Sequence, residues 1–154
     1  MALNISYQQM FSGGVLEGPV KDAVTELYTE LVEYEGTIMP DYITYARPTL
    51  EQTIQELIIN IDNCLMILVD GKQVGLLSAD KGNPAEIGAL YIKEAHRGRG
   101  FGRALINLWV SLNNHKAISV ICFTTNKLAL EFYEKAGFEF MPGKTTVKGT
   151  REFN

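Results

Sequence analysis

The sequence predicts one domain of the mixed α/β (α+β) class, in which helices flank a sheet, and two observations carry this prediction. First, segments with a helical repeat of apolar residues alternate with short apolar runs that are typical of strands. Second, 46% of the 154 residues are hydrophobic and 21% are charged, as in globular proteins. A chain of this length can bury most of its apolar surface as one unit. We therefore expect residues 1–154 to form a single domain.

The N-terminal part of the chain predicts one strand followed by two helices. The strand is expected at residues 5–11. A helical stripe of apolar residues follows, and Gly36 and Pro40 are expected to end that helix. Thr49 is a suitable N-cap for a second helix, whose apolar positions lie within 54–61. The stripe of the first helix comprises Val20, Val24, Leu27, Tyr28, Leu31 and Val32.

The remaining part of the chain predicts six strands and two helices. The dipeptide Asp70-Gly71 separates two apolar runs and is a strong hairpin signal. The expected elements are strands at 64–69, 73–79 and 85–92, a helix at about 102–114, a strand at 118–124, a helix after residue 126, and a final hairpin of 138–142 with about 145–152. The complete order is β-α-α-β-β-β-α-β-α-β-β.

Composition and charge argue against several classes of protein. The net charge of −4 disfavours nucleic acid as a partner, because such proteins usually present a basic face. Neither a membrane-spanning apolar run nor a signal peptide is evident, so no membrane partner and a cytoplasmic location are expected. Cys64 and Cys122 lie in apolar runs and are expected to be buried thiols. His96 and His115 are far apart, so no metal site is expected.

The most informative segment is His-Arg-Gly-Arg-Gly-Phe-Gly-Arg, at residues 96–103. Glycine at every second position lets several backbone N–H groups converge, since no Cβ blocks a close approach. A helix that begins there adds unpaired N–H groups and the positive end of its dipole. Arg97, Arg99 and Arg103 add three positive charges. The segment therefore suits a phosphate or a pyrophosphate, although by itself it is also compatible with a flexible basic turn.

The spacing of this segment excludes the two most common phosphate-binding loops. A P-loop requires Gly, four residues and then Gly-Lys-Ser/Thr, whereas Gly98 is followed at that distance by Arg103 and Ala104. The dinucleotide fingerprint requires Gly-x-Gly-x-x-Gly and an acidic residue about 20 residues later, and both the third glycine and the carboxylate are missing. The pattern that remains is Arg-x-x-Gly-x-Gly, read as Arg97, Gly100 and Gly102.

That pattern resembles the pyrophosphate loop of the GCN5-related N-acetyltransferases (GNAT superfamily), and a second segment strengthens the resemblance. Asn126-x-x-Ala129-x-x-Phe132-Tyr133-x-x-x-Gly137-Phe138 is similar to the family's second signature, on the helix after its fifth strand. Leu128, Phe132 and Ala136 are expected on its buried face, Asn126 as its N-cap and Gly137 as its C-terminal stop. We interpret Phe132 as a core residue and Tyr133 as a functional one.

The resemblance is strong over residues 80–138 and implies the fold and the donor. The implied fold is a GNAT-like central mixed, mostly antiparallel sheet whose fourth and fifth strands separate, with the pantetheine arm of acetyl-CoA in the opening. The implied cofactor is acetyl-CoA, with CoA as product and no metal. The implied donor-binding residues are Leu90, Tyr91, Ile92, Arg97, Gly98, Arg99, Gly100, Phe101, Gly102, Arg103, Asn126, Ala129 and Tyr133. Some of these arginines, Arg99 in particular, can instead be solvated.

The resemblance also implies catalytic roles. Tyr133 corresponds to a tyrosine that protonates the leaving thiolate as general acid, and a phenol is protonated at neutral pH. Glu86, near the start of the fourth strand, is our candidate base, although an ordinary exposed glutamate and a reaction without a dedicated base stay open. Asp80 and Glu94 are weaker candidates. The acyl oxygen is expected to accept from a backbone N–H of the fourth strand, for which Ile92 is a candidate.

The expected activity is acetyl-CoA-dependent N-acetyltransfer to a primary amine by direct attack in a ternary complex. The alternative is a sensor or interaction module of the same fold that binds acetyl-CoA or CoA without catalysis. The acceptor is a small-molecule amine or a peptide or protein amine. Glu33, Glu35 and Asp41 would favour a cationic amine such as a polyamine, an aminoglycoside or lysine, although acidic loops are commonly only solvated. Family members are often homodimers, so a homodimer is also expected.

Overall fold

The computed structural model of the chain describes residues 3–9, 18–38, 52, 64–80, 82, 84–114, 116–143 and 146–153. Within these residues the chain forms a seven-stranded sheet with the spatial order β1-β2-β3-β4-β5-β7-β6. The strands are β1 (Ile5–Gln9), β2 (Cys64–Val69), β3 (Lys72–Ala79), β4 (Ala85–Ile92), β5 (Ala117–Phe123), β6 (Glu139–Phe140) and β7 (Thr146–Glu152). The helices are α1 (Gly18–Ile38), α4 (Phe101–Leu112) and α5 (Lys127–Lys135), with a short 3-10 turn η3 (Glu94–His96).

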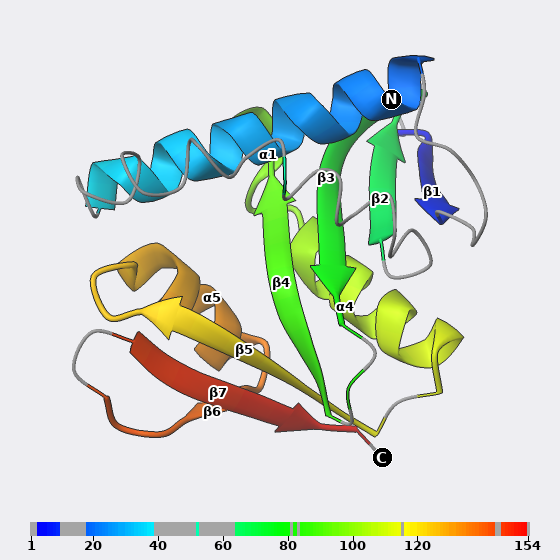
Figure 1. The fold of residues 1–154 in the computed structure, drawn as a ribbon. Helices are drawn as coiled ribbons and strands as arrows, with labels where there is room; N and C mark the ends of the chain where they lie inside the picture. The colour runs from blue at the N-terminus through cyan, green and yellow to red at the C-terminus, as the bar shows by residue number, and fades with distance from the viewer. Residues whose placement is uncertain are drawn as a thin grey trace.

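The sheet confirms the predicted fold class. Neighbouring strands pair antiparallel, except β4 and β5, which pair parallel. Helix α1 crosses one face of the sheet, while α4 lies on the opposite face (Figure 1). Each face has its own core. On the α1 side Val24 and Leu27 pack with Met66 and Leu76, and on the other side residues of α4 and α5 pack against the sheet.

Strands β4 and β5 separate, as the resemblance implied. They are paired at Ala85–Ile118, Glu86–Ser119 and Ile87–Val120. Beyond Ile87 the two strands diverge, although each continues for several residues (Figure 1). Within the described part of the chain, main-chain groups along the inner edge of β4 therefore have no neighbouring strand, and the opening between β4 and β5 can take another extended chain.

The short-range signals in the sequence are confirmed by the backbone. Asp70 and Gly71 have φ angles of 51° and 81°, as a two-residue hairpin turn requires. The Asn126 side chain caps α5 by accepting a hydrogen bond from the Ala129 N–H (3.2 Å). Gly137 has a φ angle of 98° and follows the helix in a Schellman motif, with the next N–H bonded back to the final helical turn.

Two predictions about helices were wrong. Gly36 does not end the first helix, because α1 continues through Ile38 with Gly36 buried within it. A single glycine costs a helix only about 1 kcal/mol, which packing against the sheet outweighs. The buried face of α5 contains Tyr133 and Ala136, whereas Leu128 is 64% exposed. The predicted second helix after Thr49 lies outside the described residues, as does Pro40.

Candidate active site

A cavity with a volume of about 550 Å³, hereafter the larger cavity, extends from the beginning of α4 along β4 to α5. All thirteen expected donor-binding residues lie in the described part of the chain, and every one except Arg99 lines this cavity. Arg99 is exposed to solvent, in keeping with the alternative that it is solvated. The lining residues from this set are Leu90, Tyr91, Ile92, Arg97, Gly98, Gly100, Phe101, Gly102, Arg103, Asn126, Ala129 and Tyr133.

The glycines of the loop serve two different purposes. Gly98 and Gly100 have φ angles of 78° and 82°, a backbone conformation that side chains rarely adopt, and a Cβ at either position would meet open space. A Cβ at Gly102 would instead lie 2.8 Å from Cζ of Phe132. Gly100 is the N-cap of α4 and no side chain caps the helix, so the first N–H groups of α4 are available to an anion.

Arg97 is anchored to the protein. Its Nε donates a hydrogen bond to the Ile92 carbonyl (2.8 Å). Its guanidinium carbon lies 5.6 Å from the ring centroid of Tyr34 and 5.3 Å from that of Tyr91, within cation–π range. Arg97 thus links the loop to β4 and α1, while Arg103 lines the cavity from the first turn of α4.

The inner edge of β4 presents the main chain of Leu90 and Ile92 to the opening. The Lys93 N–H donates to the Val74 carbonyl of β3 (2.8 Å), so Lys93 faces β3. Because successive residues of a strand face opposite edges, Leu90 and Ile92 face away from β3. The bond from Arg97 to the Ile92 carbonyl agrees with this orientation.

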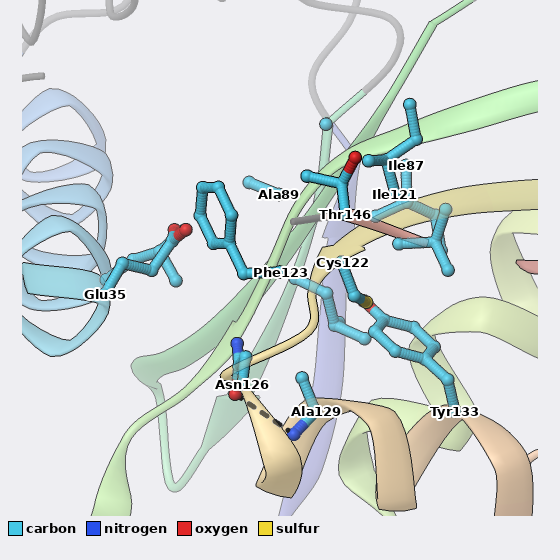
Figure 2. Close-up of a pocket in the computed structure, with 14 residues that line it drawn as sticks. Glu35, Ile87, Ala89, Ile121, Cys122, Phe123, Asn126, Ala129, Tyr133 and Thr146 are labelled. Carbon is cyan, nitrogen blue, oxygen red and sulfur yellow. Dashed lines mark hydrogen bonds between the residues drawn. The ribbon is translucent and has the colours of Figure 1, made fainter. Parts of the chain in front are cut away.

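Tyr133 lies where the larger cavity meets a smaller one. The smaller cavity, of about 150 Å³, lies in the opening between β4 and β5, and Tyr133 lines both cavities. The Tyr133 side chain reaches from α5 toward Cys122 (Figure 2). Tyr133 is only 6% exposed, and its ring meets that of Phe138 edge-on with centroids 5.1 Å apart. Burial, with smaller effects from Cys122 and Glu35, raises the pKa of Tyr133, so its hydroxyl keeps its proton.

One site therefore contains the glycine loop at the N-terminus of α4, the opening between β4 and β5, and the buried Tyr133. A sequence model of the acetyltransferase (GNAT) domain matches residues 60–140, more than half of the chain. The chain belongs to the GNAT acetyltransferase family. It is 33% identical over 99 residues to the uncharacterized N-acetyltransferase MJ1207 of Methanocaldococcus jannaschii, which covers 57% of this chain and 42% of that protein. The chain thus matches less than half the length of this curated relative.

Two solved structures share the fold of this GNAT domain. The PaiA N-acetyltransferase from Thermoplasma acidophilum, in complex with coenzyme A, has a TM-score of 0.79 at 16% identity, covering 97% of this chain and 99% of that chain. The protein PH1933 from Pyrococcus horikoshii has a TM-score of 0.71 at 20% identity, covering 98% and 99%. At these identities the likeness extends to the fold alone.

The GNAT domain places a carboxylate in its smaller cavity that the sequence did not single out as a base. Glu35, on the last two turns of α1, lines this cavity and points toward Phe123 (Figure 2). Burial raises the pKa of its carboxyl from 4.5 to about 7. A signal existed in the sequence. Glu35 continues the apolar stripe of the first helix, four residues after Leu31, and an acidic residue at such a position is unusual.

Glu86 lies away from both cavities of the GNAT domain. It pairs with Ser119, where β4 and β5 are still hydrogen-bonded. Its N–H donates to Oδ1 of Asp80 (2.9 Å), so Asp80 supports the turn before β4. Glu94 is exposed in the 3-10 turn. None of the three lines either cavity, and the catalytic role of Glu86 stays a prediction.

Both cysteines are buried thiols, as predicted. Cys64 is 2% and Cys122 6% exposed, neither forms a disulfide, and burial raises the pKa of each thiol to about 12. The described residues contain no cluster of His, Cys, Asp and Glu suited to a metal ion. Among the described helices, none combines the length and apolar character needed to cross a bilayer.

Proposed function

We propose that this GNAT domain is an acetyl-CoA-dependent N-acetyltransferase that moves an acetyl group to a primary amine by direct attack in a ternary complex. The observation that carries the proposal is the place of Tyr133 between the two cavities. One cavity begins at the glycine loop and the other occupies the opening between β4 and β5. A donor held by the loop and extended along β4 would present its thioester beside Tyr133. The coenzyme A complex of the T. acidophilum relative supports this choice of donor.

The residues of the larger cavity fit the parts of this donor. Backbone N–H groups from Gly98 to Arg103, at the positive end of the α4 dipole, would bind the pyrophosphate, and Arg103 adds a positive charge. The free edge of β4 at Ile92 would pair with the pantetheine. Acetyl-CoA supplies an activated acyl thioester, and the N–H of Leu90, which lines both cavities, would donate a hydrogen bond to its oxygen as negative charge develops there. Ile92, the donor expected from the sequence, lines only the larger cavity.

Tyr133 would serve as general acid for the departing thiolate. Because its pKa is raised above the usual value of about 10, complete transfer of its proton to a thiolate of pKa about 8.5 is uphill. The transfer becomes favourable when the hydroxyl regains a proton from the amine nitrogen at the same time. Tyr133 therefore acts as a relay that ends the reaction protonated.

Calorimetric titration of acetyl-CoA, with NAD and ATP as controls, tests the donor. We expect micromolar binding of acetyl-CoA alone, followed by amine-dependent release of free thiol. Tyr133→Phe should keep that binding and slow thiol release about 10²-fold or more, in the range of general acid–base catalysis. No binding by folded protein would exclude the proposed donor. Binding without thiol release from any amine would favour the non-catalytic CoA-binding module. The homodimer stays a prediction.

A further inference from the structure

Glu35 differs from the other described carboxylates of α1 that face the sheet. Glu26 and Glu30 form ion pairs with Lys93 at 3.1 and 2.7 Å, and these bonds attach α1 to β4. Glu35 makes no ion pair or side-chain hydrogen bond with any residue that the structure describes. It is also the single acidic residue among the described residues that line the smaller cavity. A half-buried carboxylate that has no partner among the described residues is suited to binding a cation or a proton.

The smaller cavity brings Glu35 and Tyr133 together from opposite sides. Glu35 extends from α1 on one side of the opening, and Tyr133 reaches in from α5 on the other (Figure 2). Leu31, one turn before Glu35, lines the same cavity, so this face of α1 is its wall. A volume of about 150 Å³ is comparable to cavities in other proteins that hold benzene. The space fits an acetyl group and an amine on a slender chain.

We infer that Glu35 binds the ammonium group of the acceptor and takes its proton, so that the preferred acceptors are cationic primary amines on an unbranched chain. The inference rests on the proposed function, because it assigns the acceptor side of the same site. It makes Glu35, and not Glu86, the base of the reaction.

The protons and bonds of the reaction balance with these two residues. The Glu35 carboxylate takes one proton from the ammonium, and the neutral nitrogen forms a bond to the thioester carbonyl carbon. The carbon–sulfur bond then breaks. Tyr133 gives its hydroxyl proton to the sulfur and receives the second proton of the nitrogen. The products are the amide and the free thiol, and Glu35 releases its proton to water.

The surroundings of Glu35 suit proton uptake near neutral pH. Among the described residues that line the cavity, the other titratable groups are Cys122 from β5 and Tyr133 from α5, both neutral because burial raises their pKa values. The remaining described lining residues, from α1, β4, β5, α5 with its N-cap and β7, carry no titratable group. Burial raises the pKa of Glu35 to about 7, so its carboxylate fraction grows as the pH rises through this value. Activity should follow that fraction.

A pair of amines that differ in protonation tests the inference. n-Butylamine is a cation at neutral pH, whereas trifluoroethylamine is largely neutral and needs no base. With n-butylamine, Glu35→Gln should lower kcat/KM about 10²-fold and remove the rise in activity near pH 7. With trifluoroethylamine the loss should be less than about 10-fold. Asp22→Asn, at an exposed position of the same helix, is the control and should keep wild-type activity. Branched tert-butylamine should be a poor acceptor.

Two results would overturn the inference while leaving the proposed function intact. One is an equal loss of kcat/KM with both amines in Glu35→Gln, which would indicate a structural role for Glu35. The other is loss of the pH-dependent rise in Glu86→Gln but not in Glu35→Gln, which would identify Glu86 as the base. Failure of the wild-type protein to bind acetyl-CoA would instead overturn the proposed function.

A binding measurement covers the case in which neither amine is acetylated. In protein saturated with CoA, NMR of isotope-labelled glutamate carboxyl groups, assigned with Glu35→Gln, follows Glu35 directly. Added n-butylamine should lower the pH at which the Glu35 carboxyl titrates, since a bound ammonium favours the carboxylate. An unchanged titration at saturating n-butylamine would refute the assignment of Glu35 to the acceptor.

Discussion

Glu35→Gln should make the protein more stable at alkaline pH. The carboxyl has a pKa of about 7 in the folded chain, against 4.5 for an unperturbed glutamate. Between these values the folded state binds more protons than the unfolded state, so wild-type stability falls as pH rises from about 4.5 through 7. The difference in pKa corresponds to about 3 kcal/mol at most, because one pKa unit is about 1.4 kcal/mol. Glu35 is partly exposed, so a gain of roughly 1–3 kcal/mol is expected.

Urea unfolding of the two proteins at about pH 4 and about pH 8 measures this effect. Near pH 4 the wild-type carboxyl is mostly protonated in both the folded and the unfolded state and resembles the neutral amide, so the two unfolding free energies should nearly coincide. Near pH 8 the variant should be more stable, with a Tm higher by roughly 3–10 °C for a chain of this size. Asp22→Asn, at an exposed position of the same helix, is the control and should change the free energy of unfolding by less than about 0.5 kcal/mol at either pH. A variant equal to or weaker than wild type near pH 8 would refute the reasoning.

Substitutions at three further positions test the supports of the site. Gly102→Ala places a Cβ 2.8 Å from Cζ of Phe132 and should lower the free energy of unfolding by about 1–3 kcal/mol; an unchanged urea midpoint would contradict this. Asn126→Ala removes the cap on the Ala129 N–H and should cost about 1 kcal/mol, whereas Asn126→Asp, which retains an acceptor, should cost less. Lys93→Met breaks the ion pairs to α1 at a partly exposed position and should cost about 1 kcal/mol or less, with a loss that shrinks in high salt.

Much of the fold and of the donor side of the site could be predicted because local rules govern them. The turn at Asp70-Gly71, the cap at Asn126 and the stop at Gly137 each depend on a few neighbouring residues. The loop of residues 96–103 is likewise a short-range feature, since its glycines, its arginines and the start of α4 are adjacent in the sequence. Such features can be predicted without knowing how the remainder of the chain folds.

Predictions that depended on packing were less successful. The spacing of Leu128 and Phe132 predicts that both lie on the buried face of α5. In the structure the helix face that contains Tyr133 is buried instead, and Leu128 is exposed. The sequence predicts Phe132 as a core residue and Tyr133 as a functional one, but Tyr133 is the more buried of the two. The sequence predicts a helix end at Gly36, but the packing of α1 on the sheet stabilises the helix beyond this residue.

The sequence by itself determined the family, the class of fold and the anion-binding loop, because these depend on motifs of adjacent residues and on periodicity. Tertiary structure alone decided which carboxylate faces Tyr133. Glu35 and Tyr133 are nearly a hundred positions apart in the sequence, and they line one cavity because β4 and β5 diverge between α1 and α5. Glu86, close to the loop in sequence, is held at the paired end of the same strands. Burial in that opening, and not residue type, gives Glu35 a pKa near neutrality.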